Sequence, residues 1–118
     1  MSKGYLTTHV LDTYNGKPGS GINGSIYFFE DSNPKKITDF ILNADGRCDQ
    51  PILENNLFKI GKYEIKFYCG EYYKKFTKLS DNPFLDDVVI RFGINDNNEH
   101  YHVPLLISPW SYTTYRGS

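Results

Sequence analysis

The stretch DVVIRFGIN, from Asp87 to Asn95, decides the fold class of this chain. Its apolar side chains recur at every second position, namely Val88, Ile90, Phe92 and Ile94. Successive side chains of an extended chain point to opposite faces, so a strand that is buried on one side shows this alternation. The stretch therefore predicts a half-buried β-strand.

Further candidate strands flank this stretch at residues 6–12, 25–30, 36–43, 63–69, 100–107 and 112–116. Turn-forming pairs separate them, among them Asn15-Gly16, Asn23-Gly24, Asn33-Pro34 and Asp45-Gly46. One short helix is expected over residues 71–79, because Tyr72, Phe76 and Leu79 recur there at spacings of four and three. About seven or eight short strands with such turns predict an all-β sandwich. Since no linker or repeat divides residues 1–118, we expect a single domain.

The composition agrees with a β fold and argues against several function classes. Aromatic residues make up 16% of the chain and Ala44 is its only alanine, which favours strands over helices. A net charge of −1 argues against nucleic-acid binding and against a basic membrane-surface protein. No apolar run approaches the roughly 20 residues that a membrane-spanning helix needs. With no recognisable secretion signal, and with Cys48 and Cys69 lacking metal-ligand spacing, we expect reduced thiols and a cytoplasmic location.

The three histidines His9, His100 and His102 are the first candidates for chemistry. Imidazole is the natural proton shuttle near neutral pH, because its pKa lies close to the working pH. In a strand, His9 shares a face with Thr7 and Leu11, while His100 and His102 point to one side together. Two alternatives stay open. The histidines are ordinary polar residues on a sandwich surface, or the His-x-His pair binds a metal ion, although no nearby cysteine or carboxylate cluster completes such a site.

A turn arginine and the end of the chain are the other candidates. Arg47 follows Asp45-Gly46 in a tight turn, where its planar guanidinium could grip a carbonyl edge or stabilise an oxyanion. The alternative is an ordinary solvated arginine. Residues 108–118 are aromatic and β-branched until they end in Arg-Gly-Ser, which predicts an ordered strand that delivers its last residues to a fixed place. The alternative is a strand that only completes the sandwich.

Four blocks of the sequence together carry a family resemblance. They are LTTHVLDT at residues 6–13, ADGR at 44–47, HYHVPLLISP at 100–109 and YRGS at 115–118. In this combination, and over essentially the whole chain, the sequence resembles the transthyretin-related 5-hydroxyisourate hydrolases. The resemblance implies a transthyretin-like (prealbumin-like) sandwich of two four-stranded sheets with one short α-helix. It also implies a homotetramer, built as a dimer of dimers, with active sites at the dimer–dimer interface.

The resemblance further implies a reaction and the residues that carry it. The family opens the lactam ring of 5-hydroxyisourate, the product of urate oxidation, to 2-oxo-4-hydroxy-4-carboxy-5-ureidoimidazoline in purine degradation. Matched by motif, the catalytic positions are His9, Arg47, His102 and Ser118, with Tyr115 also binding substrate, and no metal or cofactor takes part. The alternative is a transthyretin-like carrier of a small ligand without catalysis. The enzyme is favoured, because transthyretin lacks this set of residues and the YRGS ending.

These residue types can open a lactam with water. The reaction needs a base for the water, a donor for the developing oxyanion and an acid for the departing nitrogen. We expect His9 and His102 to share the base and acid roles while Arg47 holds the substrate and the oxyanion. Ser118 is expected to position substrate or water. The sequence leaves open which histidine is the base.

Overall fold

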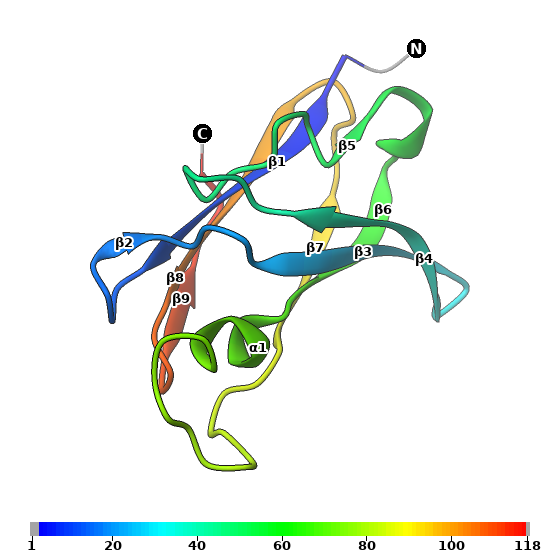
Figure 1. Ribbon diagram of the computed structural model, residues 1–118. Helices are drawn as coiled ribbons and strands as arrows, with labels where there is room; N and C mark the ends of the chain where they lie inside the picture. Colours follow the sequence, from blue (N-terminus) through cyan, green and yellow to red (C-terminus); the bar gives the residue numbers. More distant parts are fainter. Residues whose placement is uncertain (1–2, 118) are drawn as a thin grey trace.

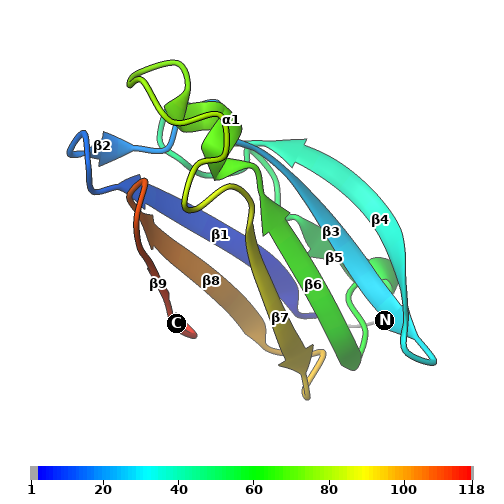
Figure 2. The same ribbon diagram turned by 90° about the horizontal axis from the view of Figure 1, so that it is seen from below.

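The computed structural model describes residues 3–117, which form two packed β-sheets with a short helix at one end (Figures 1 and 2). The first sheet contains β1 (Tyr5–Asp12), β2 (Lys17–Pro18), β5 (Leu53–Glu54), β8 (His100–Ile107) and β9 (Tyr112–Thr114). The second contains β3 (Asn23–Glu30), β4 (Asn33–Ile41), β6 (Gly61–Phe67) and β7 (Val88–Ile94). A 3₁₀-helix, η1 (Asn55–Leu57), and an α-helix, α1 (Cys69–Tyr73), lie in the connections. The all-β sandwich with a short α-helix is therefore confirmed.

The two sheets differ in how their central strands pair. The second sheet is antiparallel in the order β4-β3-β6-β7. In the first sheet β1 and β8 pair in parallel, β9 follows β8, and the short strands β2 and β5 share the other edge of β1. In the described chain β2 thus adds a two-residue fifth strand to the expected four. The parallel register places Thr7 opposite His102 and His9 opposite Pro104, so two distant blocks of sequence meet on one sheet.

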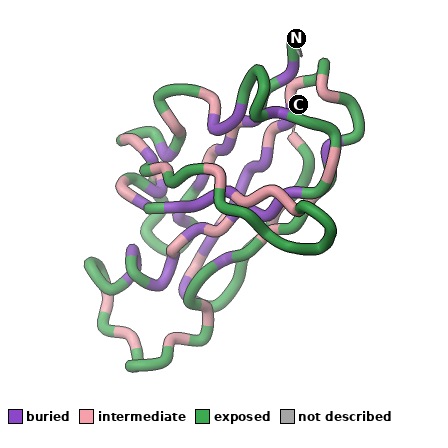
Figure 3. Tube along the Cα trace, turned by 90° about the vertical axis from the view of Figure 1, so that its right-hand side faces the viewer, coloured by how far each residue is buried: buried purple, intermediate pink, exposed green. Residues whose placement is uncertain are grey.

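The alternation along each strand decides which side chains enter the core between the sheets. The inner face of β1 is almost completely buried and carries Leu6, Thr8, Val10 and Asp12. On β7, Val88 and Ile94 are buried, and Ile90 and Phe92 pack partly buried against the same core. This confirms the strand predicted from DVVIRFGIN. Fully burying such a side chain contributes roughly 1.5–3 kcal/mol, so the alternation is sufficient to hold each strand in its orientation. Figure 3 shows the buried segments running along the strands and the exposed ones at the loops.

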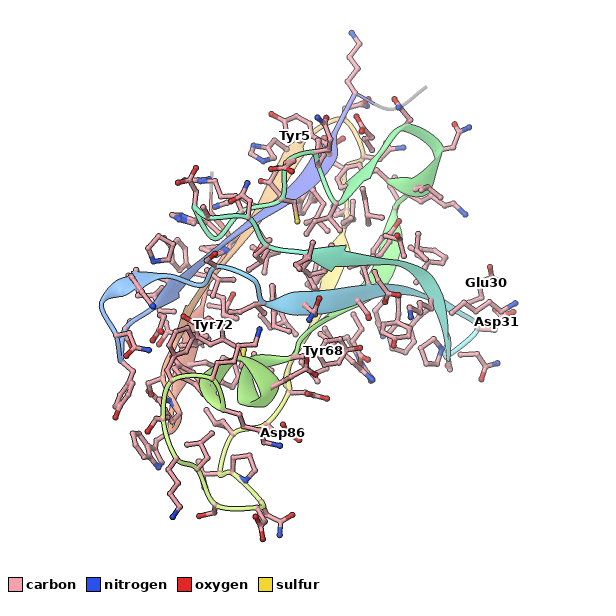
Figure 4. The ribbon with its side chains drawn as sticks, viewed as in Figure 1. Tyr5, Glu30, Asp31, Tyr68, Tyr72 and Asp86 are labelled. Atoms are coloured by element: carbon pink, nitrogen blue, oxygen red, sulfur yellow. The ribbon has the colours of Figure 1, made fainter. Side chains whose placement is uncertain are left out.

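The helix is shorter than expected and begins earlier. The spacing of apolar residues predicted residues 71–79, whereas α1 spans Cys69–Tyr73. Tyr72 (labelled in Figure 4) and Tyr73 both donate their hydroxyls to the buried carboxylate of Asp12 at 2.7 Å. The predicted contact between Tyr72 and Phe76 is present, with ring centroids 4.9 Å apart, but Phe76 is 45% exposed. The regular helix ends where its buried contacts end. No helix within residues 3–117 is long and apolar enough to cross a membrane.

The turn between β3 and β4 also differs from the expectation. Asn33-Pro34 was expected to separate two strands, but this pair begins β4 and is paired with β3. The turn is formed by Asp31 and Ser32, whose φ angles are 49° and 75° (Asp31 in Figure 4). Two consecutive residues with positive φ match the twist of a tight hairpin. Pro34 is tolerated there because β4 is an edge strand, where one row of backbone groups has no ladder partner.

Candidate active site

The outer face of the first sheet carries the three histidines. On β1, Thr7 and His9 point outward, since the positions between them are the buried ones. On β8, His100 and His102 share this outer face, which confirms the alternation expected for both strands. The hydroxyl oxygen of Thr7 lies 2.6 Å from Nε2 of His100 and 2.7 Å from Nδ1 of His102. One hydroxyl on β1 thus holds both imidazoles of β8.

The turn that carries Arg47 is docked on β1 beside His9. The side-chain oxygen of Asn43 accepts a hydrogen bond from the backbone N–H of Arg47 at 3.1 Å, which closes the turn. The N–H of Val10 donates to the carbonyl of Gly46 at 2.9 Å, and His9 and Arg47 form an isolated antiparallel bridge. Gly46 has a φ of 74°, and a Cβ there would lie 2.5 Å from the carbonyl oxygen of Val10. Only glycine lets the turn approach β1 this closely.

Arg47 and the two histidines of β8 line one cavity of about 360 Å³. The rest of its lining consists of Tyr5, Thr7, Thr8, Cys48 and Gln50. Small-molecule sites commonly have volumes of roughly 300–1,000 Å³, so this cavity suits a small heterocycle. His9 is not among the lining residues, and it adjoins the site through its backbone pairing with Arg47. The cavity therefore places a permanent cation beside two titratable rings.

The surroundings of His102 favour its neutral form. Burial lowers the pKa of His102 below its ordinary value of 6.5, and the neighbouring His100, Arg47 and His9 lower it further. A second positive charge beside a guanidinium is unfavourable, and a half-buried ring has less water to solvate its charge. Near neutral pH, His102 is thus an uncharged imidazole. Within the described chain its side-chain hydrogen bond uses Nδ1, which leaves Nε2 as the ring nitrogen without a hydrogen-bond partner among residues 3–117.

The end of the chain returns to His102. The N–H of Gly117 donates to the carbonyl of His102 at 2.8 Å, and the two residues form an isolated antiparallel bridge. Just before it, Nη2 of Arg116 pairs with a carboxylate oxygen of Glu99 at 2.7 Å, and its guanidinium lies 4.1 Å from the ring centroid of Tyr101. A Cβ on Gly117 would lie only 2.6 Å from Cδ2 of the His102 ring. The tail is therefore fixed directly against the imidazole.

The remaining predicted tail residues are placed differently. The regular strand β9 ends at Thr114, two residues before the predicted limit of 116. Tyr115 is 60% exposed and lines a second, largely apolar cavity of about 230 Å³ that also borders His102. Tyr115 is thus brought to His102 but not to the cavity that Arg47 lines. Ser118 lies outside the described residues, so its predicted role stays a prediction.

Sequence reasoning assigned no role to Thr7 or Tyr5. Thr7 bonds both imidazoles of β8, and the ring of Tyr5 stacks on His100 with centroids 4.2 Å apart and an interplanar angle of 13°. Threonine and tyrosine are common strand residues, so neither attracts notice by type. The available signal was position, because both residues share the outer face of β1 with His9.

The cysteines and the acidic residues give no further reactive centre here. Cys48 and Cys69 are both free, and burial raises the pKa of their thiols to about 11 and about 12. A thiol of that pKa is a poor nucleophile near neutral pH, since the thiolate is the reactive form. Over residues 3–117, no group of three or more His, Cys, Asp or Glu side chains is arranged to hold a metal ion.

Comparison with known proteins identifies the family of this chain. A family model described as HIUase/Transthyretin family matches residues 6–117. A curated relative from Pseudomonas aeruginosa, named 5-hydroxyisourate hydrolase, is 51% identical over 116 residues, which cover 98% of this chain and 92% of the relative. A crystal structure of (S)-allantoin synthase superposes with a TM-score of 0.92 at 45% identity, covering 99% of this chain and only 44% of that longer chain.

A transthyretin shows the same fold. The structure of sea bream transthyretin in complex with thyroxine has a TM-score of 0.86 at 24% identity, and the match covers 95% of this chain and 93% of the transthyretin. The expected transthyretin-like sandwich is thus confirmed by the strand arrangement and by this superposition. Because the family model spans nearly all of the described residues and the bacterial relative is about half identical, the chain belongs to the HIUase/transthyretin family.

Proposed function

We propose that this chain hydrolyses 5-hydroxyisourate. The observation that carries the proposal is the single cavity lined by Arg47 and His102, two residues that the sequence keeps 55 positions apart. The name of the Pseudomonas aeruginosa relative supports the choice of substrate. A fixed guanidinium beside a neutral imidazole is also what hydrolysis of a cyclic amide requires.

In the proposed reaction, a neutral histidine takes a proton from water as the water oxygen attacks the lactam carbonyl carbon. The carbonyl oxygen becomes negative, and the guanidinium of Arg47 donates hydrogen bonds to it. The carbon–nitrogen bond then breaks, and an imidazolium returns the proton to the departing nitrogen. His102 suits the base role, because burial and the neighbouring His100, Arg47 and His9 lower its pKa and favour its neutral form.

The other predicted residues have supporting roles in this proposal. His9 lies next to Arg47 through the backbone bridge and helps to protonate the leaving group. Tyr115 contacts the substrate from the side of the second cavity, which borders His102. Ser118 follows Gly117, whose backbone is bonded to His102, and positions substrate or water through its hydroxyl or carboxylate. No metal or cofactor takes part in any step.

The site is proposed to be completed in a homotetramer, a dimer of dimers in the cytoplasm. On the first sheet and its turns, several large apolar side chains are exposed: Tyr5, Leu11, Trp110 and Tyr112, with exposed fractions between 37% and 59%. Exposed apolar groups gathered on one face are typical of an interface. A second pair of chains on this face would close the cavity from water.

The test is the decay of freshly generated 5-hydroxyisourate, followed by its ultraviolet absorbance, with protein whose C-terminus carries no tag. The enzyme accelerates the decay catalytically, and a chelator leaves the rate unchanged. The rival function is a carrier of a small ligand, which the likeness to a thyroxine-bound transthyretin raises. A carrier would bind the compound without speeding its decay, and decay at the rate seen in buffer would contradict the proposal.

A further inference from the structure

The Thr7 hydroxyl lies between two imidazole nitrogens, Nε2 of His100 at 2.6 Å and Nδ1 of His102 at 2.7 Å. Both distances are those of good hydrogen bonds. A hydroxyl has one hydrogen to donate and lone pairs with which to accept, and a neutral imidazole has one N–H and one bare nitrogen. If Thr7 donates to one ring and both bonds are made, it accepts from the other ring.

This arrangement couples the tautomers of the two rings. If His102 donates from Nδ1–H to Thr7 and Thr7 donates to a bare Nε2 of His100, both rings carry their proton on Nδ1. If the bonds run the other way, both rings carry it on Nε2. Two bare nitrogens leave one bond unmade, because the hydroxyl has a single hydrogen, whereas two N–H donors occupy its two lone pairs and turn its hydrogen away from both rings. When Nε2 of His100 is bare and both bonds are kept, His102 therefore carries its proton on Nδ1, and its Nε2 is free.

We propose that Thr7 and His100 are positioning residues for His102, and that the three groups form a proton relay with both neutral rings protonated on Nδ1. This inference rests on the proposed function. Thr7 holds Nδ1 of His102, and Gly117 packs against the Cδ2 edge of the same ring. Nε2 is left as the nitrogen for substrate, and only the Nδ1–H arrangement leaves it bare and able to act as a base.

The relay moves protons without leaving one on the enzyme. Nε2 of His102 takes a proton from the attacking water, whose oxygen bonds to the lactam carbon. The Nδ1 proton of His102 passes to Thr7 as the Thr7 proton passes to Nε2 of His100, which becomes the imidazolium. When the carbon–nitrogen bond breaks, Nε2–H of His102 protonates the departing nitrogen. In the same step the Thr7 and His100 protons return by the same route, so Nδ1 of His102 is reprotonated as Nε2 gives up its proton, and both rings regain their starting tautomers.

The surroundings of the two rings favour this direction of transfer. His102 is half-buried, and burial, His100, Arg47 and His9 all disfavour a charge on it. The His100 ring is stacked on Tyr5, and the face of an aromatic ring is its electron-rich side. On its other side His100 shares a cavity lining with Glu99, Gly117 and Arg116, where the carboxylate and the guanidinium are paired. Arg47 also lines a cavity with His100. The relay therefore moves the positive charge from His102 to His100, and the charge stays within the site.

The first test is nitrogen-15 NMR of the histidine side chains in the full-length protein without substrate, above the pKa of His102. The relay predicts that His100 and His102 both show the Nδ1–H pattern. In Thr7→Val, which removes the hydroxyl at nearly the same shape, at least one ring is expected to change tautomer. In Thr7→Ser, which keeps a hydroxyl, the wild-type pattern is expected. Two Nε2–H rings, or different tautomers on the two rings, in the wild-type protein would overturn the relay.

The second test is kinetic. Thr7→Val should lower kcat by about 10-fold or more, a part of the 10²–10⁴ that proton transfer by a positioned side chain supplies, with KM nearly unchanged. Thr7→Ser should recover most of the loss. His100→Phe keeps a ring for Tyr5 to stack on but loses Nε2, and it should lower kcat in the same way. The matched control is Thr13→Val, which removes a hydroxyl bonded to the carbonyl of Ile107 at 2.8 Å, away from the cavity, and should leave kcat unchanged.

The outcomes separate this inference from the proposed function. If wild-type protein does not accelerate 5-hydroxyisourate decay, the proposed function fails, while the NMR pattern still shows whether the rings are coupled. If wild-type protein is active and folded Thr7→Val is equally active, the function stands and the relay is wrong. Loss of activity in Thr7→Val without rescue by Thr7→Ser would also contradict it, because the hydroxyl would then not be the group that matters.

Discussion

His102 is held by three separate parts of the chain. Thr7 of β1 bonds its Nδ1, Gly117 of the tail packs on its Cδ2 edge, and Arg47 from the docked turn lines the same cavity. The contacts with Thr7 and Gly117 constrain different sides of the ring, so the imidazole is held in one orientation, and Nε2 has no hydrogen-bond partner among residues 3–117. Preorganisation of this kind is what general acid–base catalysis requires, since the proton must travel along a short, fixed path.

The pH profile should report the neutral state of His102. Burial, and then the neighbouring His100, Arg47 and His9, lower its pKa below 6.5. As the pH falls through that lowered pKa, the ring becomes charged and can no longer accept a proton. The acid-side fall of kcat/KM should therefore have its midpoint below pH 6.5. Measuring kcat/KM from about pH 5 to 8, with the spontaneous decay subtracted at each pH, checks this. An acid limb with its midpoint above 6.5 would contradict the assignment.

We expect activity to require glycine at position 117, because a side chain there would collide with the His102 ring. In Gly117→Ala the new Cβ would meet the His102 ring at 2.6 Å, so either the ring or the tail must move. Displacing a reacting group by about 1 Å can cost up to 10²-fold, and we expect kcat to fall about 10- to 100-fold while the melting temperature changes little. Steady-state kinetics and a thermal melt of the variant test this. Wild-type kcat in the variant would show that the tail does not position the ring.

At the scale of elements, hydrogen bonds to the buried carboxylate of Asp12 hold α1 against β1. Asp12 is fully buried and accepts hydrogen bonds from Tyr72, Tyr73 and the side chain of Asn15. Burial opposes its charge, yet these bonds outweigh the cost and lower the pKa of the carboxyl below 3.8. The contact ties the helix to the end of the strand that carries Thr7 and His9, at a distance from the cavity.

Removing one of these hydroxyls should destabilise the fold without touching the site. Tyr73→Phe is expected to lower the free energy of unfolding at pH 7 by about 1–3 kcal/mol, the typical cost of leaving a buried polar group short of a partner. Asp12 has a lowered pKa, so its contribution is complete above the unfolded pKa of about 3.9 and is lost as the pH falls through the folded value. The difference between variant and wild type should therefore shrink in acid.

Urea unfolding at pH 7 and near pH 3 measures both effects. The matched control is Tyr14→Phe, because the Tyr14 hydroxyl makes no hydrogen bond within residues 3–117 while its ring still packs against Tyr73 and Trp110. This control should stay close to wild type. A Tyr73→Phe protein as stable as Tyr14→Phe at pH 7 would show that the carboxylate does not fasten the helix.

Predictability from sequence differed between local and distant features. The strand β7 was predictable, because the alternation of apolar and polar residues that defines it lies entirely within its own seven residues. The length of α1 was not, because the helix is fixed by Asp12, about 60 positions earlier in the chain. Likewise, the shared outward direction of His100 and His102 follows from the two-residue alternation of side chains along a strand. Their contact with Thr7 depends on the parallel register between β1 and β8, which cannot be predicted from either segment alone.

At the scale of the whole molecule, the fold brings the site residues together and, in the described chain, leaves the edge strands of both sheets unpaired on one side. The parallel pairing of β1 with β8 brings the two ends of the sequence together, and the 44–47 turn is laid over the first of them. The edge strands β7 and β9 lie on the same side of the sandwich (Figure 2) and line the second cavity with Tyr115 and His102. Unpaired strand edges are ready templates for pairing with another copy of the chain.

We therefore expect the protein to be a tetramer in solution. Four chains of 13.6 kDa give about 54 kDa, which sedimentation equilibrium distinguishes from a monomer or a dimer. Dilution to the point where the tetramer separates should lower activity per chain, because the cavity of the first sheet then becomes open to water. A monomer that keeps its full activity per chain would contradict the placement of the site between subunits.

The most direct test of the account is the kcat/KM of His102→Ala for 5-hydroxyisourate, measured on untagged protein beside wild type and Arg91→Gln. Arg91 lies on β7 of the other sheet and pairs with Glu64, so its variant controls for a general change in charge or stability. The account predicts a loss on the order of 10²–10⁴-fold for His102→Ala and a near wild-type value for the control. A folded His102→Ala protein that retains wild-type kcat/KM would contradict it.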